Sequence, residues 1–316
     1  MTEVKCFKTY QEQIEILKSR GLIINNDEQA IKILKRANYY SLINGYKDLF
    51  ITNTKPTECY RANSNFSEIV ALYCFDRRLR ELFLIELLRI EKVIRTTVTH
   101  VFSSYYGYDH KSYLSLNSFN TKGKKNLSFA QNLIDELNDK ICKYSKKHKA
   151  ISYYNTHYGY VPLWVLSTVF SFGDLNKFYS RLKYNLKKEI SNEYNLSVKD
   201  FESVLYILCA IRNKCAHGDR IYSYKKDCVS SHYIPVIKYH TLLKLPINNK
   251  GPKYGREDIL ALLIAMKYFM KPKRYNLLIT NIENQILKLS SKLTTISIYD
   301  VTEVMGLYKT WTELKK

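Results

Sequence analysis

The chain has 316 residues, 46% of them hydrophobic, which is enough to bury a sizeable core and excludes an intrinsically disordered protein. Because only 10 Gly and 6 Pro interrupt this length, we expect a mainly α-helical fold. Lys and Arg exceed Asp and Glu by 50 to 29, so the net charge of +21 favours polyanionic partners, nucleic acid first among them, unless a codon bias toward Lys, Asn, Ile and Tyr explains the excess.

The N-terminal part of the sequence predicts two helices followed by a loop. The opening residues, M-T-E-V-K-C-F-K-T-Y, lack the apolar stretch of a signal peptide. Residues 7–20 follow an amphipathic helical pattern that Gly21 ends, and one of the polar residues at 25–27 can cap a second helix that reaches about Tyr40. Residues 52–65 are a loop by composition.

The next segment predicts one long helix, because the sequence from Phe66 to Tyr106 contains no Gly or Pro and its apolar residues recur on one helical face. Two acid–arginine pairs, Asp76–Arg80 and Glu91–Arg95, have the i, i+4 spacing with the acid on the favourable N-terminal side. Both are either ordinary ion pairs on the helix surface or, for Glu91 and Arg95, part of the border of a functional cleft.

A loop at 107–125, marked by Gly, Ser and Asn, precedes a polar, lysine-bearing helix that we expect at about 126–149. The end of this helix carries the basic run K-Y-S-K-K-H-K. Such a run is commonly a solvated face, but Lys143, Lys146 and Lys147 could also form a strip that contacts phosphates.

The following sequence predicts three more helices. Pro162 can open a helix that Gly173 ends, and Asp174 can cap the next one, which continues to about Lys183. A further helix extends over about 198–217, just before a glycine.

The C-terminal part predicts an irregular stretch at 221–255, rich in Pro and Gly, and then helices at about 256–270 and 273–292. We therefore expect a mainly α protein, a helical bundle that is either one integrated domain or three segments. The three segments are an N-terminal helical segment, a helical core and a C-terminal helical extension, at 1–65, 66–225 and 226–316.

Neither a disulfide framework, nor a zinc site, nor a membrane span is expected. The seven cysteines are odd in number and form no C-x-x-C motif. The apolar stretches around 161–172 and 259–266 are too short to cross a bilayer. We therefore expect a cytoplasmic protein with reduced thiols, no metal and no cofactor.

The stretch R-N-K-C-A-H-G-D-R, residues 212–220, contains more functional groups than a helix end needs. In a helix that ends at Gly218, Asn213 and His217 are four residues apart and share a face. Arg212 lies about 140° around the axis from His217 and flanks it. A glycine is a natural residue after the last helical turn.

A histidine beside arginines can cleave RNA without a metal. A base removes the 2′-hydroxyl proton, that oxygen attacks the adjacent phosphorus, arginine stabilises the developing charge, and an acid protonates the leaving 5′-oxygen. Arg212 and Arg220 offer forked donors that match phosphate. One histidine cannot easily act as both base and acid in one site, whereas two copies of the motif facing each other across a homodimer could.

The same residues also have a purely structural interpretation. His217 could cap the carbonyl groups of its own helix, and Arg212 could pair with an acid. The spacing of Arg and His alone settles nothing, since R-T-T-V-T-H repeats it from Arg95 to His100 by chance.

Seven stretches considered together are more specific than any one motif. In chain order they are Y-Q-E-Q-I-E-I-L-K-S-R-G-L (10–22), N-Y-Y-S-L-I-N-G-Y (38–46), L-Y-C-F-D-R-R-L-R (72–80), I-E-K-V-I-R (90–95), P-L-W-V-L-S-T-V-F-S-F-G (162–173), I-R-N-K-C-A-H-G-D-R (211–220) and V-M-G-L-Y-K-T-W (304–311). In this order they resemble the bacterial abortive-infection proteins of the Abi-D/Abi-F type, a family that looks like a branch of the HEPN superfamily. The resemblance covers about residues 7–311.

The resemblance implies an α-helical HEPN core with an R-N-x-x-x-H ribonuclease motif, which maps onto Arg212, Asn213 and His217. It also implies a site between two subunits and a role in phage defence, in which RNA damage or growth arrest stops an infected cell. Glu91 and Arg95 match a family pattern as well. Some members of the branch look associated with a structured non-coding RNA that restrains a toxic protein, and some superfamily members bind RNA without cutting it.

Two hypotheses of different classes follow. In the first, the protein is a metal-independent endoribonuclease in which His217 is general acid and base and Arg212 stabilises the phosphorane. Asn213 either orients the site or contacts the phosphate. In the second, it is a non-catalytic protein that holds a structured non-coding RNA and acts by sequestration or complex assembly. A purely structural helical adaptor is a third, weaker possibility. The residues expected to bind RNA in addition to the motif are Arg220, Arg95, Glu91, Lys143, Lys146 and Lys147.

Overall fold

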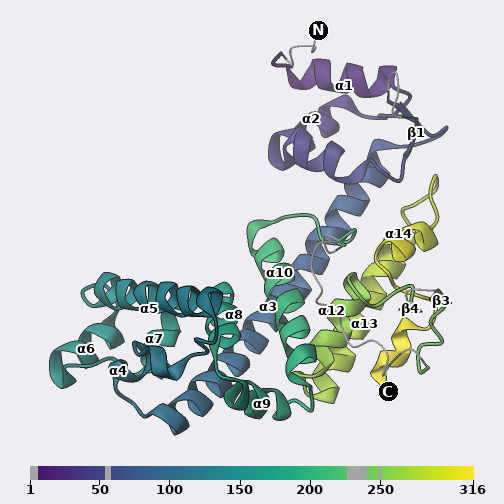
Figure 1. Ribbon diagram of the computed structural model, residues 1–316. Coiled ribbons are helices and arrows are strands. Elements are labelled where there is room, and N and C mark those ends of the chain that lie inside the picture. The colour runs from purple at the N-terminus through teal and green to yellow at the C-terminus, as the bar shows by residue number, and fades with distance from the viewer. Residues whose placement is uncertain (1–5, 54–57, 226–238, 240, 249–250) are drawn as a thin grey trace.

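The computed structural model describes residues 6–53, 58–225, 239, 241–248 and 251–316, and it is mainly α-helical, as the composition predicts. Figure 1 shows an N-terminal lobe at one end, an arm that projects to one side and a C-terminal group of helices on the other side. Cys228 and much of the irregular stretch predicted at 221–255 lie outside the described residues.

The N-terminal lobe contains the two predicted helices, a π-helical turn and a short hairpin. These elements are α1 (Tyr10–Ser19), α2 (Asp27–Ala37), η1 (Tyr40–Asn44), β1 (Ile51–Asn53) and β2 (Cys59–Tyr60). Asn26 caps α2, because its side chain accepts from the backbone N–H of Gln29. The loop predicted at 52–65 is partly wrong, since β1 and β2 pair antiparallel through Ile51 and Tyr60 and so bury the Tyr60 ring.

Helix α3 (Phe66–Tyr106) confirms the long helix predicted from the absence of Gly and Pro. At 1.5 Å per residue it is about 60 Å long. Figure 1 shows it running from the N-terminal lobe through the centre of the molecule into the arm. Apolar side chains are buried along its whole length, so the lobe, the arm and the C-terminal helices all pack on one continuous element.

The arm is built on the second half of α3. Its elements are α4 (His110–Tyr113), η2 (Leu116–Ser118), α5 (Lys124–Tyr144), α6 (Lys149–Tyr158), α7 (Leu163–Leu166), η3 (Ser167–Val169), α8 (Phe172–Arg181) and α9 (Tyr184–Asn192). The helix predicted at 126–149 ends at Tyr144. His148 adopts extended backbone and caps α6, because its ring accepts from the N–H of Ile151, the third residue of that helix.

The helix predicted from Pro162 to Gly173 breaks at Phe170, which adopts extended backbone. Ser171 then caps α8, and its hydroxyl accepts from the backbone N–H of Asp174 while the Asp174 carboxylate accepts from the backbone N–H of Ser171. This reciprocal capping box starts α8 before Gly173 and makes Asp174 its third residue, where the sequence predicts the cap itself.

Helix α10 (Val198–His217) and the C-terminal helices cover the other side of α3. The C-terminal elements are β3 (Ile247–Asn248), β4 (Gly251–Pro252), α12 (Ile259–Lys267), α13 (Pro272–Ser290), α14 (Ile298–Val304) and η4 (Trp311–Lys315). All side chains of α12 from Ile259 to Met266 are buried, since the helix lies between α10 and α13. None of the helices in the described ranges combines the length and the apolar character that a membrane crossing requires.

Candidate functional site

The predicted end of α10 is confirmed. Gly218 has a φ of 77°, a left-handed conformation that suits glycine, and the N–H of Asp219 donates to the carbonyl of Lys214 at 2.9 Å. His217 occupies the last turn with an exposed side chain, and within the described chain its ring has no hydrogen bond or ion pair. The structure therefore lacks the helix-capping contact that the structural interpretation of His217 requires.

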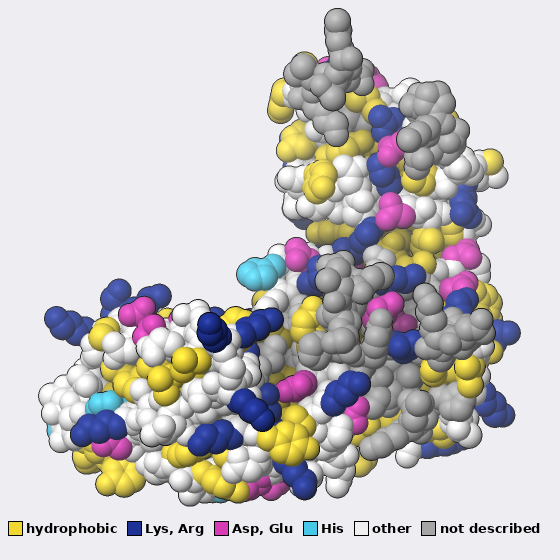
Figure 2. Space-filling model, in the orientation of Figure 1, with side chains coloured by type: hydrophobic (Ala, Val, Ile, Leu, Met, Phe, Trp, Pro, Cys, Tyr) yellow, Lys and Arg dark blue, Asp and Glu magenta, His cyan; other side chains and the backbone are white. Residues whose placement is uncertain are grey.

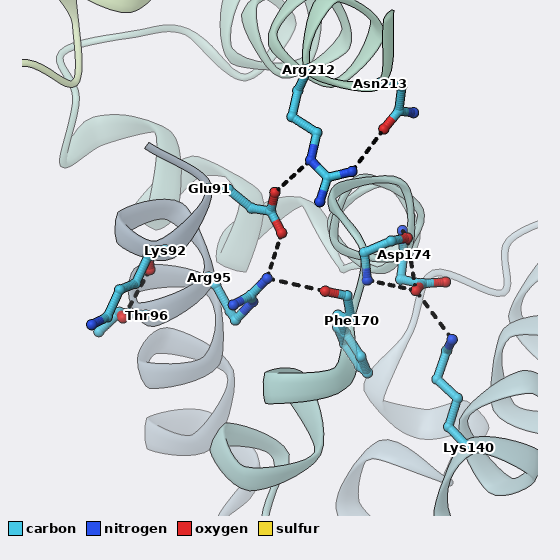
Figure 3. A network of polar contacts seen from close by, with 10 residues as sticks. Glu91, Lys92, Arg95, Thr96, Lys140, Phe170, Asp174, Arg212 and Asn213 are labelled. Atoms are coloured by element: carbon cyan, nitrogen blue, oxygen red, sulfur yellow. Dashed lines mark hydrogen bonds and ion pairs between the residues drawn. The ribbon is translucent and has the colours of Figure 1, made fainter. Parts of the chain in front are cut away.

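Arg212 is paired with an acid, and the acid is Glu91 of α3. The Glu91 carboxylate is 5% exposed and accepts from Arg212 Nε at 3.1 Å and from Arg95 Nη2 at 2.5 Å (Figure 3). One carboxylate thus joins two guanidinium groups, and the cluster keeps an excess of positive charge. We call Glu91, Arg95, Arg212 and Asn213 the arginine network.

Asn213 holds Arg212 from a second side. Arg212 Nη1 donates to Asn213 Oδ1 at 3.3 Å, and the Asn213 amide nitrogen lies 3.9 Å from the sulfur of Cys209. Burial raises the pKa of the Cys209 thiol to about 11, which keeps it protonated. The Arg212 side chain is 22% exposed, so the N–H groups that face away from Glu91 and Asn213 can reach a ligand.

The break at Phe170 supplies the third anchor of the network. The carbonyl of Phe170 accepts from Arg95 Nη2 at 3.0 Å, whereas Arg95 Nε is buried with no hydrogen-bond partner among the described residues. A continuous helix through this position would have used that carbonyl internally. Sequence reasoning missed this contact. Its sequence signal is the capping-box pattern, in which Ser171 is followed three residues later by the acid Asp174.

Asp174 and Lys140 lie on the Phe170 side of the network in Figure 3, and sequence reasoning assigned neither to a site. Lys140 of α5 donates to the Asp174 carboxylate at 3.1 Å. Burial opposes ionisation of Asp174, but hydrogen bonds from Ser171 and Lys140 outweigh burial and lower its pKa. The pair joins the end of α5 to the start of α8.

The basic run begins three residues after Lys140. Lys143, Lys146 and Lys147 are exposed, and none has an ion pair with a described residue. The Lys143 ammonium lies 5.4 Å from the centre of the Tyr144 ring. Figure 2 shows more Lys and Arg than Asp and Glu on the visible face of the arm. The run is thus a solvated cationic surface near the beginning of α8.

Arg220 points away from the arginine network toward the N-terminal lobe. It donates to the carbonyl of Gly45 and, at 2.8 Å, to the carboxylate of Asp48, and its guanidinium lies 5.8 Å from the centre of the Tyr222 ring. A cleft of about 290 Å³ lies between residues 218–220 and the lobe. Arg220 therefore fastens the loop after α10 to the lobe.

The Asp76–Arg80 pair, predicted on the helix surface, is buried instead. Asp76 accepts from Arg80, from the Tyr46 hydroxyl at 2.6 Å and from the backbone N–H of Tyr222 at 2.6 Å. Arg80 also donates to the carbonyl of Asp219 at 3.3 Å. We call these residues the buried lock, because they hold the loop that follows His217 against α3.

Within the part of the chain that the structure describes, no group of three or more His, Cys, Asp or Glu side chains could hold a metal ion. The last turn of α10 presents a solvent-exposed imidazole, and the arginine network beside the same helix presents two anchored guanidinium groups. Such groups can bind a phosphate and exchange protons beside it.

Comparison with known proteins shows the family of the chain. A family model described as Abi-like protein matches residues 32–223, well over half of the chain, and this range extends from α2 past the end of α10. Searches of curated proteins and of solved structures find no significant match. The chain therefore belongs to the Abi-like protein family, which indicates a role in abortive infection, a defence against phage.

Proposed function

We propose that the protein is a metal-independent endoribonuclease of phage defence, which acts in the cytoplasm as a homodimer. The observation that carries the proposal is the combination at the end of α10. There, a buried carboxylate holds Arg212 in place, and an exposed His217 without a described partner follows five residues later on the same helix. Family membership supports the same role in abortive infection.

The anchoring of Arg212 supports a catalytic use. Glu91 and Asn213 fix the guanidinium from two sides, so its remaining N–H groups are oriented before a ligand arrives. Donors that need no rearrangement stabilise the charge of a phosphorane best, because no energy is spent on reorienting them during the reaction. Arg95 adds a second positive charge next to the same carboxylate.

The proposed reaction is cleavage by the 2′-hydroxyl. His217 of one subunit removes the proton, the 2′-oxygen bonds to phosphorus, and Arg212 holds the non-bridging oxygens. The bond to the 5′-oxygen then breaks, and that oxygen takes a proton from the second subunit's imidazolium. The products are a 2′,3′-cyclic phosphate and a 5′-hydroxyl end.

The position of α10 supports the composite site. In Figure 1 this helix rises from α9 toward the N-terminal lobe, so its last turn lies in the open angle between the lobe and the arm. An exposed helix end in an open angle can approach the same element of a second copy. Such an arrangement would bring two imidazoles to one phosphate, which one chain cannot do.

The alternative function is RNA holding without cleavage. Its specific support is the ion pairing itself, because Glu91 already occupies part of the hydrogen-bonding capacity of both Arg95 and Arg212. The net charge of +21 also favours RNA binding whether or not cleavage follows. In this case a structured non-coding RNA would lie over the arginine network.

The test compares wild type with His217→Ala. Protein is purified from a native-like host, any co-purifying nucleic acid is sequenced, and the stripped protein is incubated with cellular RNA in EDTA. We expect wild type to cleave and to leave 5′-hydroxyl ends, and we expect His217→Ala to be inactive with unchanged thermal stability, since the side chain is exposed. His110→Ala, which changes a histidine of α4 outside the network, serves as the matched control and should cleave normally.

Cleavage that survives His217→Ala would contradict the nuclease. No cleavage by wild type, together with one discrete co-purified RNA, would make RNA holding the primary function and the arginine network a binding site.

A further inference from the structure

A pocket opens on α3 immediately beyond the arginine network. It has a volume of about 430 Å³, and it begins at Thr96, the neighbour of Arg95, and continues past Ser103. Trp164 of α7 and Tyr108, which follows α3, form its aromatic walls. Ligand pockets for small organic groups have this size and this mostly apolar lining.

The two aromatic walls begin a longer row of rings on the arm. Centres of neighbouring rings are 5.4 Å apart for Tyr108 and Tyr160, 6.1 Å for Tyr160 and Tyr158, and 6.0 Å for Tyr158 and Tyr153. We call Trp164, Tyr108, Tyr160, Tyr158 and Tyr153 the aromatic strip. It connects the pocket to α6.

The rings of the strip are accessible to a partner. Trp164 is 44% exposed, Tyr108 60% and Tyr158 52%, whereas most large apolar side chains of the fold are buried. Covering exposed aromatic surface with a partner lowers the free energy of the complex, because the rings are removed from water. Contiguous exposed rings therefore mark an interaction site. The core packing of the arm does not explain them.

Positive charge lies beside the far end of the strip. Helix α6, which carries Tyr153 and Tyr158, begins at Lys149 and directly follows the exposed lysines of the basic run, Lys146 and Lys147. Rings interleaved with cations are the arrangement by which proteins bind single-stranded nucleic acid, since bases stack on the rings and phosphates meet the cations. This charge favours a nucleic acid over an apolar protein surface as the occupant.

The floor of the pocket can form hydrogen bonds to a base. The hydroxyls of Thr96 and Thr99 donate to carbonyls of α3, at 3.0 Å to Lys92 and 2.9 Å to Arg95, so their lone pairs stay available for an incoming N–H group. The hydroxyl oxygen of Ser103 is buried and has no partner among the described residues. A buried hydroxyl without a partner is costly, so the Ser103 hydroxyl is a weak point of the packing next to the pocket.

We propose that the pocket and the aromatic strip bind unpaired bases of a single-stranded RNA, one base stacking on Trp164 inside the pocket and others following along the tyrosines. Arg95 and Ser103 are separated by about 12 Å along the helix axis, so a strand held in the pocket passes the arginine network within a few nucleotides. The proposal deepens the proposed function, because it rests on RNA as the partner and names the single-stranded form.

The test uses the fluorescence of Trp164. The chain has two tryptophans, and Trp311 is buried, so Trp311→Phe leaves Trp164 as the single reporter. The substitution His217→Ala is included to prevent cleavage by the proposed metal-independent site. We expect a short single-stranded oligouridylate to quench the fluorescence to saturation, while a duplex of the same length and an abasic strand with the same number of phosphates bind at least about tenfold more weakly.

Substitutions in the strip should separate stacking from charge. Trp164→Ala and Tyr158→Ala should each lower the affinity for the oligonucleotide by about tenfold, as measured by fluorescence anisotropy. Trp164→Phe should bind it nearly as well as wild type, because this variant keeps an aromatic ring. Tyr299→Ala serves as the matched control, since this exposed tyrosine lies on α14, outside the arm, and should change nothing.

Three results would overturn the proposal. The first is Trp164 fluorescence that stays unquenched in a saturated complex, and the second is an affinity for the abasic strand equal to that for the oligouridylate. The third is that variants of the strip bind RNA normally but no longer sediment as a dimer, which would make the strip a protein–protein contact. The outcome is independent of the nuclease. If the oligonucleotide quenches Trp164 but wild type cleaves no RNA, the binding role of the strip is supported and the proposed nuclease is contradicted. If wild type cleaves normally and Trp164→Ala binds with unchanged affinity, the nuclease is supported and the binding role of the strip is contradicted.

Discussion

Helix α3 carries two acid–arginine pairs with identical spacing, and the structure uses them in opposite ways. In the buried lock, the side chains of Asp76 and Arg80 are 0% and 9% exposed. In the arginine network, Glu91 is as deeply placed, at 5%, but its partner Arg95 is 21% exposed. The pairs therefore differ mainly in the access of the cation to solvent.

The hydrogen bonds around the two acids explain the difference. Donors from the N-terminal lobe and from the loop after α10 fill the acceptor positions of Asp76, so this carboxylate joins three parts of the chain and has no capacity left for a ligand. Among the described residues, Glu91 accepts from Arg95 and Arg212 alone, and both arginines keep donors that face away from it. A buried pair whose bonds are all satisfied is structural, and a pair with spare donors at the surface can bind a phosphate.

The largest effect should come from opening the buried lock. Asp76→Asn removes the charge that compensates Arg80 in a buried site, and we expect it to lower the free energy of unfolding by about 3–5 kcal/mol. Glu91→Gln should cost only about 1 kcal/mol, because Arg95 and Arg212 can turn to water. Urea unfolding of the two variants measures both values, and a larger loss for Glu91→Gln would contradict the comparison.

An intermediate effect should come from the cation of the open pair. Arg212→Lys keeps the charge but loses the forked donors, and if the proposed nuclease is correct, we expect the single-turnover cleavage rate to fall by roughly a hundredfold with nearly unchanged stability. Arg80→Lys is the matched substitution in the buried lock, and it should lower stability and leave the cleavage rate of the folded fraction intact. Equal cleavage by both variants would show that the donors of Arg212 carry no catalytic role.

The smallest effect concerns Asp174 at the edge of the network. Since the pKa of Asp174 is lowered in the folded protein, its carboxylate stabilises the fold at every pH above the ordinary pKa of an aspartate. This contribution is lost as the pH falls through the lower folded pKa. Asp174→Asn should therefore reduce the free energy of unfolding near pH 6 by about 0.5–1 kcal/mol, and by progressively less as the pH falls through the folded pKa of Asp174. Unfolding curves of both proteins over this pH range test the sign, and a difference that grows in acid would refute it.

Much of the local structure could be predicted from the sequence. The absence of Gly and Pro defines α3 from Phe66 to Tyr106, and Gly218 marks the end of α10. The Glu91–Arg95 pair also forms as its spacing predicts. The break at Phe170 was not predicted, because the same few residues fit two patterns. They fit both a capping box, which starts a new helix, and the apolar pattern of one continuous helix.

The candidate site is only half visible in the sequence. Arg212, Asn213 and His217 are neighbours in the chain, so their grouping follows from helical geometry alone. The partner that orients Arg212, however, lies 121 residues away in Glu91, and no local pattern connects the two. The tyrosines of the aromatic strip are likewise inconspicuous among the 28 tyrosines of the chain.

The sequence by itself therefore determined the elements and the chemistry within each of them, because helix formation, capping and i, i+4 pairing depend on residues a few positions apart. Only the tertiary structure decided which acid–arginine pair is closed and which stays open. Burial and the supply of hydrogen-bond donors depend on which distant segments pack together. On α3 the loop after α10 covers Asp76, while the carboxylate of Glu91 receives a second arginine and the surface beside it remains accessible.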